Sequence, residues 1–315
     1  NFKKILYDDN SIDIIQGYIP DADSLTSMLG LDNILADKQV HMLSMVAIPK
    51  HLRHLAGWDR VESEIPKDFD LTIAVDGSKK DIFAKALEDG KLAKKPFIIL
   101  DHHDAESDIE FDTVNIIDPS VASTGELIFK LSKDMGWEIS KETASLLATS
   151  IMYDTLGLSS VNTTSSTIRS LADLVDIGAD LAAIENDRRS SMKRSQELTE
   201  YKGRLLQRIE YFHEGQVATI GIPWEEIEEY SPHYNPPMLI FEDMRMTEGV
   251  KVVIAFKYYP DKVTGKIRAN HGSPIAAKLA EAFGGGGHEY SSGFKVMDRQ
   301  RDVKSEVLKK LGELL

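Results

Sequence analysis

Residues 96–103, PFIILDHH, hold the pattern that decides how this chain folds. A short apolar run ends there in Asp101, His102 and His103. Short apolar runs that alternate along a chain with amphipathic stretches of helix length are typical of strands joined by crossover helices in a parallel sheet. In such a sheet the residues that follow the strands are the first candidates for chemistry.

The same alternation runs through the first half of the chain and predicts an α/β fold with a parallel sheet. The expected strands are residues 11–19, 40–48, 71–76, 96–101 and 113–118, and the expected helices are residues 22–35, 80–93, 122–136, 140–156 and 165–176. Ser123, Ser140 and Thr164 precede three of these helices, and their side-chain oxygens predict N-caps.

The second half of the chain predicts a separate and smaller mixed α/β unit. Its expected strands are residues 216–222, 250–259, 265–270 and 291–296, with a helix at 274–283 and the run GGGGH at 284–288. The length of 315 residues suits two domains. We expect residues 1–186 to form the first domain, residues 187–212 a charged connector helix, and residues 213–315 the second domain.

Composition and charge exclude several classes of protein. With 42% hydrophobic and 28% charged residues, the chain is globular rather than disordered. No apolar run reaches the roughly 18 residues that a membrane-spanning helix needs. The net charge of −14 opposes binding of long duplex nucleic acid. We expect a cytoplasmic location. Because the sequence does not begin with Met, it leaves open whether an N-terminal region precedes it.

Acidic residues follow several of the expected strands. Asp21 and Asp23 follow the first strand, Asp76 ends the third, and Asp154 lies in the stretch MYDTLG. A single Asp after a strand is most often a turn or cap residue. Because the chain has no cysteine, carboxylates and imidazoles are its metal ligands, and this ligand set suits manganese, magnesium or iron.

The order of these motifs resembles that of the DHH phosphoesterase superfamily. The series comprises IPDADS (19–24), AVDG (74–77), LDHH (100–103), YDT (153–155) and GGGGH (284–288). Residues 115–129 and 150–181 resemble further segments of the family, so the likeness covers nearly the whole chain. GGGGH, with an Arg some twenty residues before it, resembles the associated C-terminal domain of the branch that holds RecJ-like exonucleases, nanoRNase, pAp-phosphatase and cyclic-dinucleotide phosphodiesterases.

The resemblance implies a centre with two divalent cations, usually manganese. By motif position Asp76 would bridge the two ions. Asp23, His102 and Asp154 would complete one metal site, and Asp21 would belong to the other. His103 would face the substrate phosphate as a hydrogen-bond donor. Two such cations activate a water for attack on phosphorus and neutralise the charge of the transition state.

The resemblance also implies that the second domain closes over an active-site cleft and binds substrate. Its expected ligands are the side chains of Arg268 and His288 and the backbone of four glycines, Gly284, Gly285, Gly286 and Gly287. Glycine has no Cβ, so its N–H group can approach a phosphate or a base closely. A flexible linker is the alternative interpretation of the glycine run.

One position departs from the family pattern. The first motif normally begins with a metal-binding His four residues before the first Asp, and that position is Gly17 here. His41, His51 and His54 are replacements only where the fold brings them near. Three consequences are open: a two-metal enzyme with weak metal binding, a one-metal enzyme, or a protein that binds nucleotides without turnover.

The leading hypothesis is a divalent-metal-dependent phosphoesterase that hydrolyses short nucleotide substrates. These are oligoribonucleotides, linear or cyclic dinucleotides, or 3′-phosphoadenosine 5′-phosphate. The alternatives are a polyphosphatase or pyrophosphatase, which share the DHH half, and a nucleotide-binding protein without catalysis. Proteins of this superfamily are often dimers, which makes a homodimer an alternative to a monomer.

Overall fold

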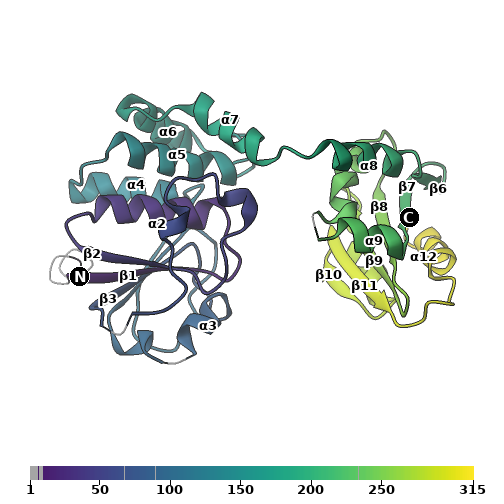
Figure 1. The fold of residues 1–315 in the computed structure, drawn as a ribbon, viewed down its shortest axis with the longest axis horizontal. Helices are drawn as coiled ribbons and strands as arrows, with labels where there is room; N and C mark the ends of the chain where they lie inside the picture. The colour runs from purple at the N-terminus through teal and green to yellow at the C-terminus, as the bar shows by residue number, and fades with distance from the viewer. Residues whose placement is uncertain (1–5, 7–9, 67, 89, 233) are drawn as a thin grey trace. The chain divides into compact units, whose positions relative to one another are not determined.

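The computed structural model describes residues 6, 10–66, 68–88, 90–232 and 234–315. The chain divides into two compact units, Asn1–Lys193 and Arg194–Leu315 (Figure 1). Most of the N-terminal stretch NFKKILYDDN lies outside the described residues. Among the helices of the described ranges, none combines the length and the apolar character needed to cross a bilayer.

Unit 1 contains a five-stranded parallel sheet, as the apolar runs predict. Its strands are β1 Ser11–Gln16, β2 Gln39–Leu43, β3 Leu71–Val75, β4 Phe97–Asp101 and β5 Val114–Ile117. The order in space is β2-β1-β3-β4-β5, and every pairing is parallel. The chain therefore reverses its direction of winding between β1 and β3. Two strands are shorter than expected, since β1 ends before residues 17–19 and β2 before residues 44–48.

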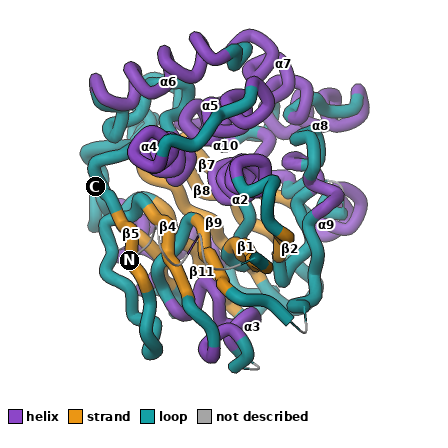
Figure 2. Tube along the Cα trace, turned by 90° about the vertical axis from the view of Figure 1, so that its left-hand side faces the viewer, coloured by secondary structure: helices purple, strands orange, loops and turns teal. Residues whose placement is uncertain are grey.

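The long helices of unit 1 lie on one face of this sheet in two layers. They are α2 Ala22–Ile34, α4 Thr124–Met135, α5 Lys141–Asp154, α6 Ser165–Ile177 and α7 Leu181–Ser191. Figure 2 shows α2 and α4 next to the strands, with α5 stacked above them. Ser123, Ser140 and Thr164 accept the predicted N-cap hydrogen bonds, so all three cap predictions are confirmed.

The opposite face of the sheet is covered by short turns, and here one prediction is wrong. Residues 80–93 do not form one helix. They form a 3-10 turn at Lys80–Phe83, a single helical turn α3 at Ala84–Leu87, and a second 3-10 turn at Leu92–Lys94. Gly90 adopts a positive φ of 66°, a conformation that ends a helix.

Unit 2 contains a six-stranded mixed sheet of order β10-β11-β9-β8-β7-β6. Its strands are β6 Glu210–Phe212, β7 Val217–Ile222, β8 Val252–Tyr258, β9 Val263–Ala269, β10 Gly286–His288 and β11 Ser291–Val296. Its helices are α8 Gln196–Leu206, α9 Trp224–Tyr230, α10 Phe241–Arg245, α11 Ala276–Glu281 and α12 Val303–Gly312. The α/β fold class, with a parallel sheet and a second mixed unit, is confirmed.

Separate apolar clusters cover the two faces of this second sheet. Residues of α11 and α12 pack on one face, whereas residues of α8, α9 and α10 pack on the other, mainly against β7 and β8. The segment expected as one connector helix, residues 187–212, contains the end of α7, all of α8 and strand β6.

Candidate metal centre

The acidic motifs of unit 1 gather at the carboxyl ends of its strands. Asp21 and Asp23 follow β1, Asp76 follows β3, and His102 follows β4. Strands β1 and β3 are neighbours, and they are also the two strands between which the winding reverses. Connections leave such a pair in opposite directions, which opens a crevice for ligands at this edge of the sheet. The topology therefore explains why motifs far apart in sequence meet there.

His102 lies at the middle of the carboxylates. Its Nε2 atom is 3.1 Å from Oδ2 of Asp154 and 3.6 Å from Oδ2 of Asp23. Oδ1 of Asp76 is also 3.6 Å away. Adjacent ligands at about 2.1 Å from one octahedral ion are separated by about 3.0 Å, so the atoms of Asp23, His102 and Asp154, which all lie within 4.8 Å of one another, need only small shifts to bind one cation. Among the described residues, Nε2 of His102 is buried without a hydrogen-bond partner, as expected for a metal ligand.

Asp23 is fixed by the start of helix α4. Its Oδ2 accepts a hydrogen bond from the Thr124 N–H at 2.8 Å, and its Oδ1 accepts one from the Gly125 N–H at 3.2 Å. Ser27 and Ser150 donate their hydroxyl groups to the same Oδ1, at 3.0 and 2.6 Å. Helix N-termini favour negative charge, so the carboxylate is held in place before any ligand binds.

Asp76 occupies a constrained position. Its φ of 61° is left-handed, which is uncommon for a residue other than glycine and is found at functional sites. Thr124 donates its hydroxyl group to Oδ1 of Asp76 at 3.2 Å. Burial raises the pKa of Asp76 well above its ordinary value, and the charges of Asp23, Asp21 and Asp154 raise it further. A bound cation would favour the ionised carboxylate, because it supplies the charge that the site lacks.

Asp101 orients His103. Oδ1 of Asp101 accepts a hydrogen bond from Nδ1 of His103 at 2.7 Å and from the backbone N–H groups of His102 and His103. Burial would raise the pKa of Asp101, but the hydrogen bonds from His103 outweigh it and lower that pKa. The Asp101 hydrogen bond raises the pKa of His103 in turn. The His103 side chain is 57% exposed, so with Nδ1–H donated to Asp101 the protonated imidazole has an Nε2–H group that could reach a phosphate.

Among the residues that the structure describes, two groups of side chains have atoms close enough to share an ion. One is Asp23, His102 and Asp154, and the other is Asp76, His102 and His103. Asp21 belongs to neither group, since its Oδ1 atom caps helix α2 by accepting the Ser24 N–H at 2.9 Å. Its charge still raises the pKa values of Asp76 and Asp154, so Asp21 lies at the same edge of the sheet.

A neighbouring residue occupies the space beside Gly17. A Cβ atom placed on Gly17 would lie 2.5 Å from Cγ2 of Ile82, and the Tyr18 N–H donates to the Ile82 carbonyl oxygen at 3.1 Å. The turn at Lys80–Phe83 therefore occupies the space that a side chain at position 17 would enter. The first-motif imidazole is absent, and the chain has packed an aliphatic residue in its place.

The three histidines considered as replacements lie elsewhere. His41 contacts Gln39 and Glu62 beside strand β2. Nε2 of His54 lies 3.3 Å from the hydroxyl oxygen of Tyr153, and His51 is exposed. Among the described residues, neither candidate metal group includes any of the three.

The glycine run of unit 2 is a strand rather than a linker. Gly286–His288 forms β10, and the pairings place His288 opposite Ser291 and Ser291 opposite Arg268. Two strand spacings separate His288 from Arg268, about 10 Å, and their side chains share one face of the sheet. Gly285 is required by packing, because a Cβ there would lie 2.1 Å from the Gly293 carbonyl oxygen. The structure therefore brings these expected substrate ligands together within unit 2.

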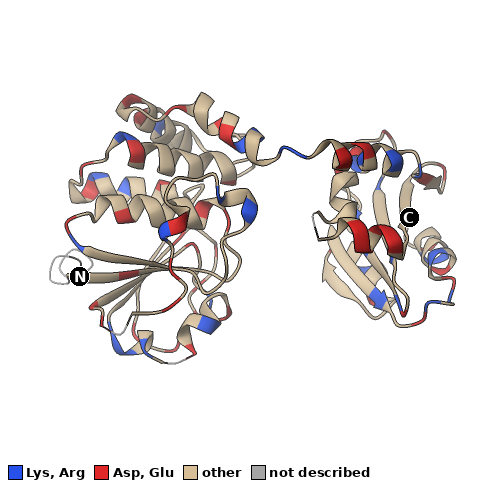
Figure 3. Cartoon of the chain, viewed as in Figure 1, with Lys and Arg blue, Asp and Glu red and all other residues tan. Residues whose placement is uncertain are grey.

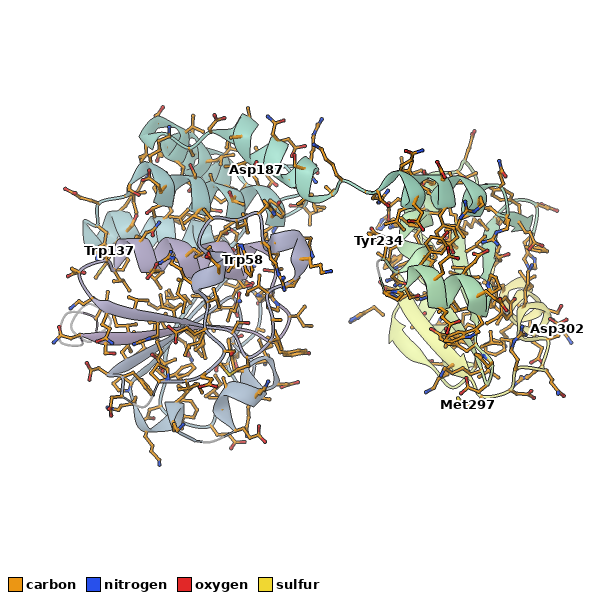
Figure 4. The ribbon with its side chains drawn as sticks, in the orientation of Figure 1. Trp58, Trp137, Asp187, Tyr234, Met297 and Asp302 are labelled. Atoms are coloured by element: carbon orange, nitrogen blue, oxygen red, sulfur yellow. The ribbon has the colours of Figure 1, made fainter. Side chains whose placement is uncertain are left out.

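The three tryptophans pack against apolar clusters. Trp58 and Trp137 (Figure 4) are partly buried against the main apolar cluster of unit 1, and Trp224 packs against a cluster of unit 2. Sequence reasoning missed the residues that hold the site: Thr124, Gly125, Ser150, and Asp101 as the partner of His103. The sequence indicated these residues only in part. The N-cap at Ser123 predicts where the helix begins, but it does not predict which carboxylate the start of this helix binds.

Fold and site together define an α/β protein with a carboxylate–imidazole centre suited to a divalent cation. Residues 11–151 match the DHH family, N-terminal domain. The bifunctional oligoribonuclease and PAP phosphatase NrnA of Bacillus subtilis is 21% identical over 282 residues, covering 88% of this chain and 86% of that protein. The protein of the same name from Thermus thermophilus is 26% identical, covering 87% and 80%.

A solved structure supports the fold across both units. The crystal structure of an exopolyphosphatase-related protein from Bacteroides fragilis matches with a TM-score of 0.80 and 23% identity. The match covers 99% of this chain and 96% of that one. The two-unit fold is therefore shared with a solved protein.

Proposed function

We propose that this protein is a divalent-metal-dependent phosphoesterase that hydrolyses short nucleotide substrates. The observation that carries the proposal is the position of His102 Nε2, within 3.6 Å of three carboxylates at the switch point of the sheet. The relatives that are named as oligoribonuclease and PAP phosphatase support short nucleotides as the substrate class. A cytoplasmic location and a homodimer remain predictions.

The residues present fit one divalent cation well. Asp23, Asp76, His102 and Asp154 would hold it, and manganese is the proposed ion. Such an ion lowers the pKa of a bound water and neutralises charge that develops on a phosphoryl group. Asp21 and Asp76 would supply a second, weaker position, because Gly17 offers no side chain and Ile82 fills the adjoining space.

The other side chains would position the substrate. His103, held through Nδ1 by Asp101, would donate its Nε2–H to a phosphate oxygen. Its raised pKa keeps a larger fraction of the imidazole protonated near neutral pH, which strengthens that hydrogen bond. Arg268, His288 and the backbone of Gly284 to Gly287 would bind the rest of the nucleotide.

A product-resolved assay tests the proposal. Chromatography would follow pApA, cyclic di-AMP, 3′-phosphoadenosine 5′-phosphate, a short oligoribonucleotide and pyrophosphate with manganese. Asp76→Asn is the matched variant, because asparagine tolerates the left-handed backbone at this position. We expect turnover of a nucleotide that Asp76→Asn abolishes.

Two other results would each favour an alternative function. Release of orthophosphate from pyrophosphate, far faster than any nucleotide reaction, would promote the pyrophosphatase or polyphosphatase. Nucleotide binding by calorimetry without product would promote the binding protein that has lost its catalysis.

A further inference from the structure

Gln16, the last residue of strand β1, has a buried amide group that the proposed metal centre does not use. The residue is 3% exposed. Within the part of the chain that the structure describes, neither Oε1 nor Nε2 of Gln16 has a hydrogen-bond partner. A buried amide without partners costs free energy, because both of its polar groups have lost their hydrogen bonds to water. In a folded protein such a group indicates that a partner binds there.

The register of the sheet places Gln16 at the edge that carries the carboxylates. Its Cα is paired with that of Val75, which directly precedes Asp76. Gln16 is also followed directly by Gly17, the position at which the first-motif imidazole is absent. The unpaired amide therefore belongs to the residue next to the lost ligand, on the strand beside that of Asp76.

The alternation of side chains along β1 directs Gln16 towards the starts of α2 and α4. Ile12 and Ile14 pack in one apolar cluster with residues of these two helices, and side chains two residues apart on a strand share a face. Strands β1 and β2 are parallel, so α2 must return along the sheet and begin at the carboxyl end of β1. Its N-cap Asp21 and its first-turn residue Asp23 therefore lie at the same end of β1 as Gln16.

The carboxylates at this edge repel one another. The charges of Asp23, Asp21 and Asp154 all raise the pKa of Asp76. None of the five strands of unit 1 contains Lys or Arg (Figure 3), so the sheet itself supplies no positive charge to them. Nε2 of Gln16 donates a hydrogen bond to none of these carboxylates. A cation at this edge would attract the amide oxygen and the carboxylates together.

We propose that Oε1 of Gln16 is a ligand of the second, weaker cation, in place of the imidazole that is absent at Gly17. Asp21 and Asp76 would be the other protein ligands of this ion. The inference rests on the proposed function and adds a residue to its metal centre. Amide oxygens are hard ligands that suit manganese and magnesium, and they add no further negative charge to a site already rich in carboxylates.

Manganese calorimetry and thermal unfolding of the metal-free chain test the inference together. Gln16→Met keeps an unbranched side chain of similar size and removes the amide. We expect this variant to bind the second manganese ion about tenfold more weakly or worse, since even the loss of a group that only orients a metal ligand costs that much. Binding of the first ion should not change. Without metal, the melting temperature should rise by about 2 °C or more, because the unsatisfied amide is gone.

Thr72→Val is the matched control. The Thr72 hydroxyl is also fully buried, and no described residue forms a hydrogen bond with it, but Thr72 lies near the start of β3, at the far end from the carboxylates. This variant should also raise the melting temperature of the metal-free chain, and it should leave the binding of both manganese ions unchanged. Gln16→Glu keeps the oxygen ligand and adds a charge, so it should bind the second ion more tightly than the wild type does.

Three results would overturn the inference. The first is a wild type that binds only one manganese ion at saturating concentrations. The second is unchanged binding of the second ion in Gln16→Met, whatever its melting temperature. The third is a loss of the second ion in Thr72→Val as large as the loss in Gln16→Met.

Hydrolysis of nucleotides by the same preparations separates this inference from the proposed function. Turnover by the wild type, with second-ion binding that does not depend on Gln16, would refute the ligand assignment alone. Absence of all turnover, with second-ion binding that Gln16→Met weakens, would refute the phosphoesterase and leave the ligand assignment standing.

Discussion

Restoring the histidine of the first motif should destabilise this protein unless Ile82 is also replaced by a smaller residue. The Cβ of Gly17→His would lie 2.5 Å from Cγ2 of Ile82, whereas carbon atoms in ordinary contact are separated by about 3.5 Å or more. The turn at Lys80–Phe83 must therefore move by about 1 Å. Overpacking of this kind costs about 1–3 kcal/mol, which lowers the melting temperature of a unit of this size by about 2–12 °C.

The double variant Gly17→His/Ile82→Ala separates packing from metal binding. Alanine at position 82 removes the clashing Cγ2 but also loses the packing of Ile82, so we expect the double variant to be at least about 1 kcal/mol more stable than the sum of the Gly17→His and Ile82→Ala effects. Urea unfolding without metal would measure this coupling. Gly203→His is a control, because nothing lies near a Cβ at Gly203.

Manganese titration by calorimetry gives the second readout. We expect the wild type to bind one ion tightly and the double variant to bind the second ion more tightly than the wild type does. Gly17→His as stable as the wild type, or no rescue by Ile82→Ala, would refute the packing argument.

Three further predictions concern the residues around the centre. Gly125→Ala should destabilise unit 1 by about 2 kcal/mol and weaken manganese binding in calorimetry, because its Cβ would lie 2.2 Å from the Ser150 Oγ that holds Asp23. The control Gly203→Ala, where the added Cβ meets open space, should instead raise the free energy of unfolding by up to about 1 kcal/mol. Asp101→Asn should lower the pKa of His103, so the alkaline limb of the pH–rate profile should move to lower pH; an unmoved limb would contradict the role of His103. Burial raises the pKa of Asp13 to about 7, so the native state keeps a proton that the unfolded state releases near pH 4. The free energy of unfolding should therefore fall as the pH rises from about 4 to 7, and urea unfolding of Asp13→Asn should lack this fall.

The local elements of the fold were largely readable from the sequence. Apolar runs such as residues 71–76 gave the strands, because burial in a parallel sheet demands continuous apolar residues. Hydroxyl side chains at Ser123, Ser140 and Thr164 marked helix starts, because capping is a contact between residues three apart. The helix expected at 80–93 failed because the left-handed Gly90 interrupts it and the segment is used to cover the sheet.

The sequence likewise predicted some features of the site, and the structure alone showed the others. Residue order alone identified Asp23, Asp76, His102, His103 and Asp154 as candidates, since each belongs to a short motif. It did not reveal that the start of α4 holds Asp23, that Asp101 orients His103, or that Ile82 fills the space beside Gly17. Asp101 and His103 are only two residues apart, so their contact is local. The other two contacts join segments that only the sheet order brings together, so their physical cause, packing between residues distant in sequence, exists only in the tertiary structure.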